Sequence, residues 1–170
     1  MVRDSTGLGR VRWFLGFVIF GLVVSGLTAF PLRHELEILA ELVTDSDGLS
    51  PRFPAFPGLT EWVVKVRDGL IATDETYPFV AYGTDWLAFG HLIIALFFIL
   101  PFRDPVRYSG VLWIGVVACV LVIPTALICG PIRGIPFFWQ LIDCSFGILC
   151  LPPLLWALRE IRRIESTSAQ

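Results

Sequence analysis

The sequence predicts an all-α membrane protein, a four-transmembrane-helix bundle with a helical and irregular cap outside the membrane. Of its 170 residues, 55% are hydrophobic and only 16% are charged, which is too apolar for a soluble domain of this length. Four hydrophobic stretches reach the ~17 residues that a helix needs to cross a bilayer. They cover 13–30, 86–102, 108–130 and 135–158, so we treat 1–170 as a single membrane domain whose extracytoplasmic cap is 31–84.

The first stretch, 13–30, has a second interpretation. Arg3, Arg10 and Arg12 precede it and small residues close it, as in a secretory signal peptide. Its uninterrupted apolar run of 18 residues exceeds the usual signal-peptide core of about 7 to 15. We therefore expect a retained transmembrane helix.

The cap segment combines two helical patterns with an irregular crossing. Apolar residues recur at helical spacing over 32–43, which predicts an amphipathic surface helix. Three prolines in 45–58 predict an extended connection. A second short helix is predicted from Thr60, as its N-cap, to about Ala72.

The basic residues indicate how the spans are oriented. With four spans, eight of the 13 Lys and Arg residues fall on one side of the membrane and five on the other. Because cytoplasmic loops carry the excess, both termini are expected in the cytoplasm, in a bacterial-type cytoplasmic membrane. The eight are Arg3, Arg10, Arg12, Arg103, Arg107, Arg159, Arg162 and Arg163, and the five are Arg33, Arg52, Lys65, Arg67 and Arg133.

Polar side chains recur at one predicted depth of the bundle. A rise of ~1.5 Å per helical residue, counted from the predicted outer end of each span, places His91 and Asp143 roughly 8 to 12 Å below the boundary. Ser25 and Thr125 come out at a similar depth. An ionisable group inside a membrane is costly unless it has a partner or a function, so His91 and Asp143 are the chain's most informative residues.

These two ionisable residues lie on faces that suit helix contact. Gln140 and Gly147 share the face of Asp143, while Thr84 and small alanines share the face of His91. Small side chains let helices approach closely in lipid. We therefore expect the two faces to meet and His91 to pair with Asp143.

Two functional interpretations of this polar layer stay open. In the preferred one, its hydrogen bonds fix helix register, and the protein is a noncatalytic structural or accessory subunit of a membrane complex. In the alternative, an outward-facing pocket handles a proton or binds a small amphipathic ligand such as a quinone or a lipid. The residues that would line it are His91, Asp143, Gln140, Thr125, Ser25 and Thr84.

The short outer turn 131–134 contributes a possible rim to that site. Its Gly and Pro residues constrain it, and it carries Arg133. We expect Arg133 to form an ion pair with Asp85, at the start of the second span; contact with lipid phosphate is the alternative.

No motif in the sequence predicts a cofactor or a catalytic site. Haem b ligation by His91 is disfavoured because the only other histidine, His34, belongs to the cap. The histidines and cysteines lack metal-ligand spacing, there is no CxxC pair, and no nucleophile motif is present. Without a basic stripe nucleic acid is not an expected partner, which leaves the lipid bilayer and a partner subunit or homo-oligomer.

Overall fold

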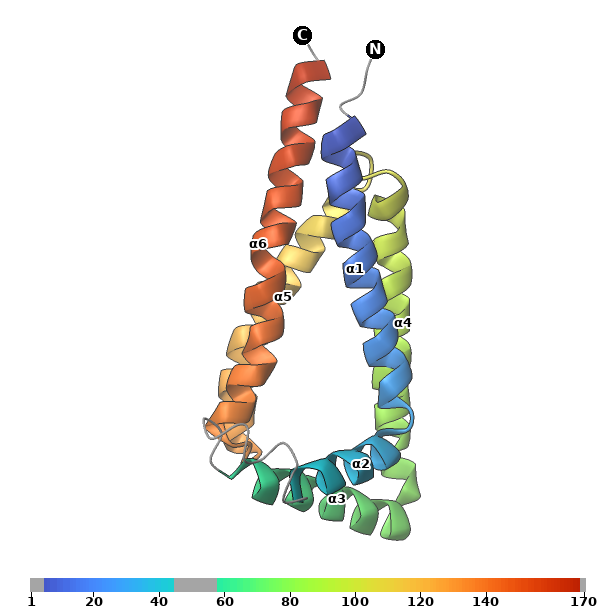
Figure 1. Cartoon of the computed structure of the whole chain (residues 1–170), viewed down its shortest axis with the longest axis vertical. Helices are drawn as coiled ribbons and strands as arrows, with labels where there is room; N and C mark the ends of the chain where they lie inside the picture. Colours follow the sequence, from blue (N-terminus) through green and yellow to red (C-terminus); the bar gives the residue numbers. More distant parts are fainter. Residues whose placement is uncertain (1–4, 45–57, 169–170) are drawn as a thin grey trace. The chain divides into compact units, whose positions relative to one another are not determined.

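The computed structural model describes residues 5–44 and 58–168, and every regular element in these ranges is helical (Figure 1). Four of the helices are long and apolar enough to cross a membrane, which confirms the predicted fold class. The predicted extended segment 45–58 lies outside the described residues, apart from Gly58. The elements are α1 (Ser5–Ala29), α2 (Leu32–Thr44), α3 (Leu59–Thr76), the 3₁₀-helix η2 (Pro78–Val80), α4 (Tyr82–Arg103), α5 (Ser109–Ile132) and α6 (Phe137–Ser168).

The chain divides into two compact units, which are described separately. Unit 1 comprises residues 1–21 and 94–170, and unit 2 comprises residues 22–93. Unit 1 therefore contains α5, α6, the first part of α1 and the last part of α4. Unit 2 contains α2, α3 and η2 with the rest of α1 and α4.

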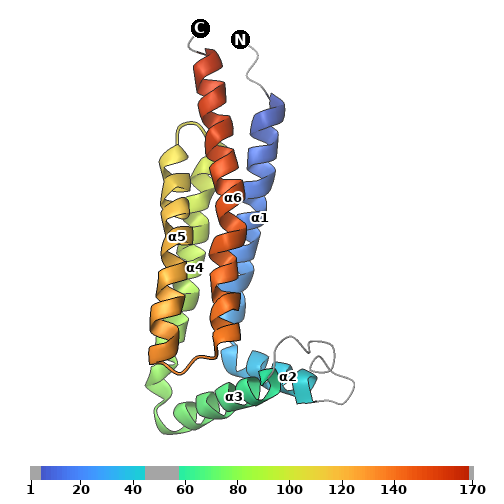
Figure 2. The same ribbon diagram turned by 90° about the vertical axis from the view of Figure 1, so that its left-hand side faces the viewer.

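In unit 1, α5 and α6 pack side by side along much of their length (Figure 2). Glycines allow this approach at two levels, because Gly130 lies against the side chain of Gln140 and Gly147 lies against the backbone carbonyl of Cys119. At a third level, Gly115 faces Leu154. Close approach at small residues is the usual way in which helices associate in lipid, where the hydrophobic effect between helices is lost.

Helix α6 extends well past the predicted end of the fourth span at residue 158. Pro152 and Pro153 lie inside it, yet the helix continues to Ser168. Beyond residue 158, Ile161 and Ile164 are buried at a spacing of three residues while their neighbours carry charge. This amphipathic pattern is satisfied by packing, which is why the helix does not stop at the end of the apolar run.

The buried residues of this last part of α6 share a unit with the start of α1. Glu160 lies over Gly7, where a methyl group built on the glycine would be 2.7 Å from the carboxylate Oε1. Arg12 of α1 donates a hydrogen bond to the carbonyl oxygen of Arg103, at the end of α4, over 3.1 Å. The first turns of α1 and the last turns of α4 and α6 therefore meet at one end of unit 1.

At the opposite end of α5, a glycine ends the helix. Gly134 has a φ of 69°, a left-handed conformation that favours glycine. The N–H of Ile135 donates to the carbonyl of Gly130 over 2.9 Å, and that of Gly134 donates to Pro131 over 3.1 Å. These two bonds form a Schellman motif, which satisfies carbonyls that the helix end leaves free and reverses the chain into α6.

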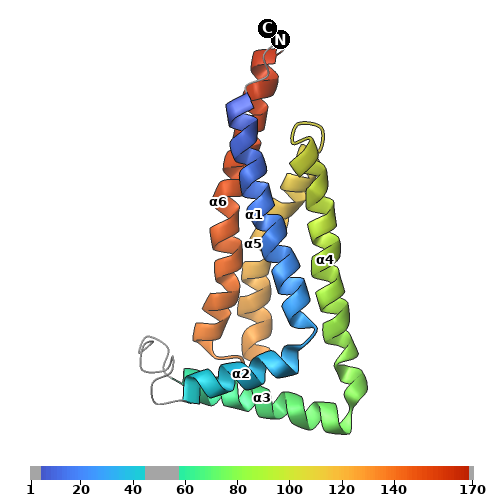
Figure 3. The same ribbon diagram turned by 45° about the vertical axis from the view of Figure 1, so that its right-hand side comes forward.

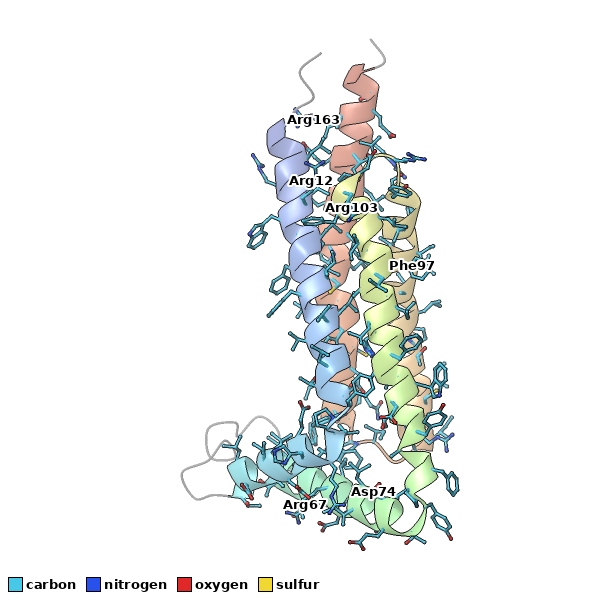
Figure 4. All side chains as sticks on the ribbon, turned by 90° about the vertical axis from the view of Figure 1, so that its right-hand side faces the viewer. Arg12, Arg67, Asp74, Phe97, Arg103 and Arg163 are labelled. Atoms are coloured by element: carbon cyan, nitrogen blue, oxygen red, sulfur yellow. The ribbon has the colours of Figure 1, made fainter. Side chains whose placement is uncertain are left out.

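In unit 2, α2 and α3, the two helices predicted for the cap, pack side by side as an antiparallel pair (Figure 3). Their shared core contains Ala40, Val43 and Val63, all nearly inaccessible, with Leu39 and Leu59 around them. Arg33 of α2 forms an ion pair with Asp74 of α3 over 3.1 Å, in addition to one within its own helix. Figure 4 labels Asp74 and Arg67 on α3.

The predicted capping role of Thr60 is wrong. Helix α3 begins at Leu59, with Gly58 at a φ of 80° as its N-cap, and it continues to Thr76 instead of ending near Ala72. The hydroxyl of Thr60 donates instead to the carbonyl oxygen of Val43 over 3.1 Å. That carbonyl belongs to the last turn of α2, where no N–H of the same helix can reach it. The neighbouring helix therefore supplies the donor.

Unit 2 also joins the end of α1 to the start of α4. A methyl group built on Gly26 would lie 3.0 Å from the carbonyl oxygen of Ala88, so the two backbones approach closely there. Helix α4 starts at Tyr82, earlier than the predicted Trp86. Tyr82 contacts Trp86 edge to face, with ring centroids 5.9 Å apart, and Trp86 contacts Phe89 in the same way at 5.7 Å.

Candidate functional site

The polar residues of α5 and α6 that the sequence singles out are used mainly within the fold. Thr125 donates its hydroxyl to the carbonyl of Leu121 over 2.8 Å, one turn earlier in α5. Gln140 is buried, with 4% of its surface exposed, and donates from Nε2 to the carbonyl of Ile135 over 2.8 Å. This bond links the first turn of α6 to the α5–α6 turn, so Gln140 supports the chain reversal.

Asp143 differs from these neighbours. It is partly buried in α6, and among the described residues of unit 1 no donor forms a hydrogen bond or an ion pair with its carboxylate. The next residue, Cys144, is buried and lies with its Sγ 4.0 Å from the carbonyl of Ile123 on α5. The packing of α5 on α6 therefore leaves the carboxylate of Asp143 without a described partner in unit 1.

In unit 2, the side chains of Thr84 and His91 also bond to backbone carbonyls, whereas Ser25 takes part through its backbone carbonyl. Thr84 donates its hydroxyl to the carbonyl of Ala81 over 2.6 Å, and the carbonyl of Ser25 accepts from Thr28 over 3.3 Å. His91 places Nδ1 2.8 Å from the carbonyl of Leu87, one turn earlier in α4. A carbonyl oxygen only accepts, so Nδ1 donates this bond and Nε2 takes no part in it.

The two residues of the predicted His91 and Asp143 pair lie in different units, His91 in unit 2 and Asp143 in unit 1. Their approach stays a prediction. The same holds for the rim pair, because Asp85 lies in unit 2 and Arg133 in unit 1. Within its own unit, Arg133 is exposed, and its backbone N–H donates to the carbonyls of Cys129 and Gly130 at the end of α5.

The face of α6 that carries Gln140 and Gly147 packs in part against α5, within unit 1. Both residues contact α5, at Gly130 and at Cys119 respectively. Sequence reasoning placed them on one face but did not identify α5 as a partner for it. The signal was present as alternating spacings of four and three in both helices, in Leu112, Val116, Cys119, Ile123, Ala126 and Gly130 of α5 and Gln140, Cys144, Gly147, Leu151, Leu154 and Leu158 of α6.

Metal-ligand geometry is not found in the part of the chain that the structure describes, where no three His, Cys, Asp or Glu residues cluster. All four cysteines carry free thiols. His34, in α2, has an exposed side chain whose Nδ1 is 3.9 Å from a carboxylate oxygen of Glu37. Comparisons with protein-family models, with curated proteins and with solved structures find no match to this chain.

Proposed function

We propose that this small integral membrane protein is a noncatalytic subunit or accessory component of a membrane protein complex. The observation that supports this proposal most directly is the internal use of its polar groups. Thr125, Gln140 and Ser145 each donate to a backbone carbonyl of the same helix or of the adjoining turn, over 2.6 to 2.8 Å. Donors used in this way do not converge on a substrate, but they do make the helices compatible with lipid.

The exposed apolar surfaces of the spans also support a role as a subunit of a complex. Most residues of the four candidate spans are not buried within the chain, so large apolar side chains are available to lipid or to another membrane protein. Examples on α5 are Ile114 and Leu121, which are exposed. An accessory subunit of this size would hold its own helices together through glycine contacts and use these faces for the complex.

The orientation is also part of the proposal. Seven of the eight described arginines of unit 1 gather at the end that contains Arg12 and Arg103. Cytoplasmic ends carry such an excess, so we assign both termini to the cytoplasm. A C-terminal green fluorescent protein fusion should fluoresce, whereas a C-terminal alkaline phosphatase fusion should be inactive. Active phosphatase would contradict the assignment.

The test of the accessory role is recovery of a stoichiometric partner from the native membrane. The tagged chain is extracted in mild detergent, and the mass of the complex is measured by native mass spectrometry. We expect a second protein in constant ratio, and the same ratio with Asp143→Asn, because an amide keeps the size and hydrogen-bonding capacity of the side chain. A monodisperse chain without protein partner, from cells where deletion has a phenotype, would contradict the proposal.

A second candidate function rests on Asp143 and His91. Within its own unit the carboxylate of Asp143 has no described partner, and the hydrogen bond of His91 to Leu87 leaves Nε2 free to accept a proton. If these groups handle a proton or a charged ligand, Asp143→Asn and His91→Gln should each abolish the cellular function while the protein still inserts and folds. Asp143→Glu, which keeps the charge, is the matched control and should retain part of it. Full function in both Asp143→Asn and His91→Gln would exclude this candidate.

A further inference from the structure

Positive charge gathers at one end of unit 1. Among the described residues, that end contains seven arginines and three acidic residues, and Figure 4 shows Arg12, Arg103 and Arg163 there on three different helices. The arginines are Arg10, Arg12, Arg103, Arg107, Arg159, Arg162 and Arg163, and the acidic residues are Asp104, Glu160 and Glu165. One limit of each of the four candidate spans lies at this end, so we expect it at the depth of lipid headgroups.

Several of these cations already have a role inside the protein. Arg12 donates to the carbonyl of Arg103, and Arg163 pairs with Glu160 at 4.0 Å. Arg107 lies over the ring of Tyr108, with its Cζ 5.4 Å from the ring centroid. Arg159 and Arg162 are exposed on α6, and no carboxylate in the described ranges forms an ion pair with either.

Arg159 and Arg162 are neighbours on the surface of α6. Residues three apart on a helix have Cβ atoms about 5 to 6 Å from one another, and like charges there repel. The Cζ of Arg162 lies 5.5 Å from the centroid of the Trp113 ring, on α5. Stacking on an aromatic face leaves the N–H edge of a guanidinium available to a planar or tetrahedral anion.

An apolar track leads from this pair toward the middle of α5. Trp113 is partly exposed, and Val117 and Val120 follow it at helical spacings of four and three with about half of their surfaces exposed. These three residues share one face of α5. The surface therefore has a cationic head, an aromatic boundary and an apolar tail, in the order of a phospholipid's own groups.

We propose that Arg159, Arg162 and Trp113 bind the phosphate group of an anionic phospholipid, whose acyl chains lie along Val117 and Val120. The anion relieves the repulsion between the two guanidinium groups, and the ring of Trp113 holds Arg162 at the interface, where tryptophan is favoured. A net negative headgroup is preferred because the surrounding end of unit 1 has more arginines than acidic residues.

The test measures lipid retention by the full-length protein in detergent, by native mass spectrometry, after incubation with equal amounts of phosphatidylglycerol and phosphatidylcholine. We expect preferential retention of phosphatidylglycerol. One basic residue near a membrane surface contributes about a five-fold change in affinity, so Arg162→Gln and Arg159→Gln should each lower phosphatidylglycerol retention by roughly that factor. Arg162→Lys keeps the charge without the planar fork and should give an intermediate loss.

The matched control is Arg67→Gln, an arginine of α3 that lies outside this cluster and pairs with the neighbouring Asp68, which should leave retention unchanged. Circular dichroism spectra check that each variant folds. If Arg162→Gln does not fold, Arg162→Lys takes its place in the comparison. Equal retention of both lipids by the unmodified protein, or equal losses in Arg162→Gln and Arg67→Gln, would overturn the proposal. Displacement of the lipid by inorganic phosphate alone would also overturn it, because the site would then take the free anion.

Discussion

The side chain of Gln140 lies against Gly130, so that the first turn of α6 and the end of α5 share one packed layer. A methyl group built on Gly130 would be 2.6 Å from both Cγ and Cδ of Gln140. The same glutamine donates to the carbonyl of Ile135 in the intervening turn. Gln140 therefore cannot move away from Gly130 without losing a hydrogen bond.

Gly130→Ala should accordingly destabilise the protein. Overpacking of a filled contact costs about 1 to 3 kcal/mol. The control is Gly110→Ala, in the first turn of the same helix, where nothing lies within 4 Å of the added methyl group. Denaturation in mixed detergent micelles, followed by circular dichroism, should show a loss for Gly130→Ala and none for Gly110→Ala. Equal stability of the two variants would mean that Gln140 is free to rearrange.

Gly147→Ala should cost more than Gly115→Ala. A methyl group on Gly147 would overlap the backbone carbonyl of Cys119 and the side chain of Val122, and the helix backbone cannot yield locally. On Gly115 it would be 3.1 Å from Phe98 and 3.3 Å from Leu154, both of which are side chains that can rotate. We expect a loss of about 3 kcal/mol for the first variant and about 1 kcal/mol for the second. The reverse order in the same denaturation assay would contradict the observed α5–α6 contact.

Gly134→Ala should weaken the turn between α5 and α6. Its φ of 69° is a left-handed conformation that costs an L-residue with a Cβ roughly 1 to 2 kcal/mol. Asparagine tolerates this region better, so Gly134→Asn should lose less than Gly134→Ala. The measurement is again the free energy of unfolding in detergent. A smaller loss for alanine than for asparagine would rule out the Schellman motif as the reason for this glycine.

The α2–α3 pair should depend on its apolar core more than on its ion pair. Val63 has 1% of its surface exposed, so Val63→Ala removes buried methyl groups and should cost about 1 to 2 kcal/mol. Arg33→Gln removes an ion pair with Asp74 between exposed groups, which is screened by water, and should leave stability unchanged within error. Hydrogen exchange of the α2 and α3 amides in the full-length protein would measure both. Faster exchange in Arg33→Gln than in Val63→Ala would contradict this ranking.

Several local features of the fold were predictable from the sequence because they depend on neighbouring residues alone. The four spans follow from apolar length, and the surface helix α2 follows from the spacing of its leucines and valine. The limits of α6 were not predictable in this way, because Pro152 and Pro153 suggest an end where packing of Ile161 and Ile164 continues the helix. Threonine is a common N-cap residue, but the hydroxyl of Thr60 donates to a carbonyl of another helix.

The sequence by itself determined that this is a membrane protein, how many of its helices can cross a bilayer, and which few polar residues those helices carry. These properties depend on apolar length and helical spacing, which involve only residues close together in the chain. Only the tertiary structure decided that the Gln140 and Gly147 face of α6 packs on α5, that Thr60 bonds to Val43, and that Arg162 lies over Trp113. Each of those contacts joins residues distant in the chain, and its existence depends on how closely two backbones can approach, which no local pattern specifies.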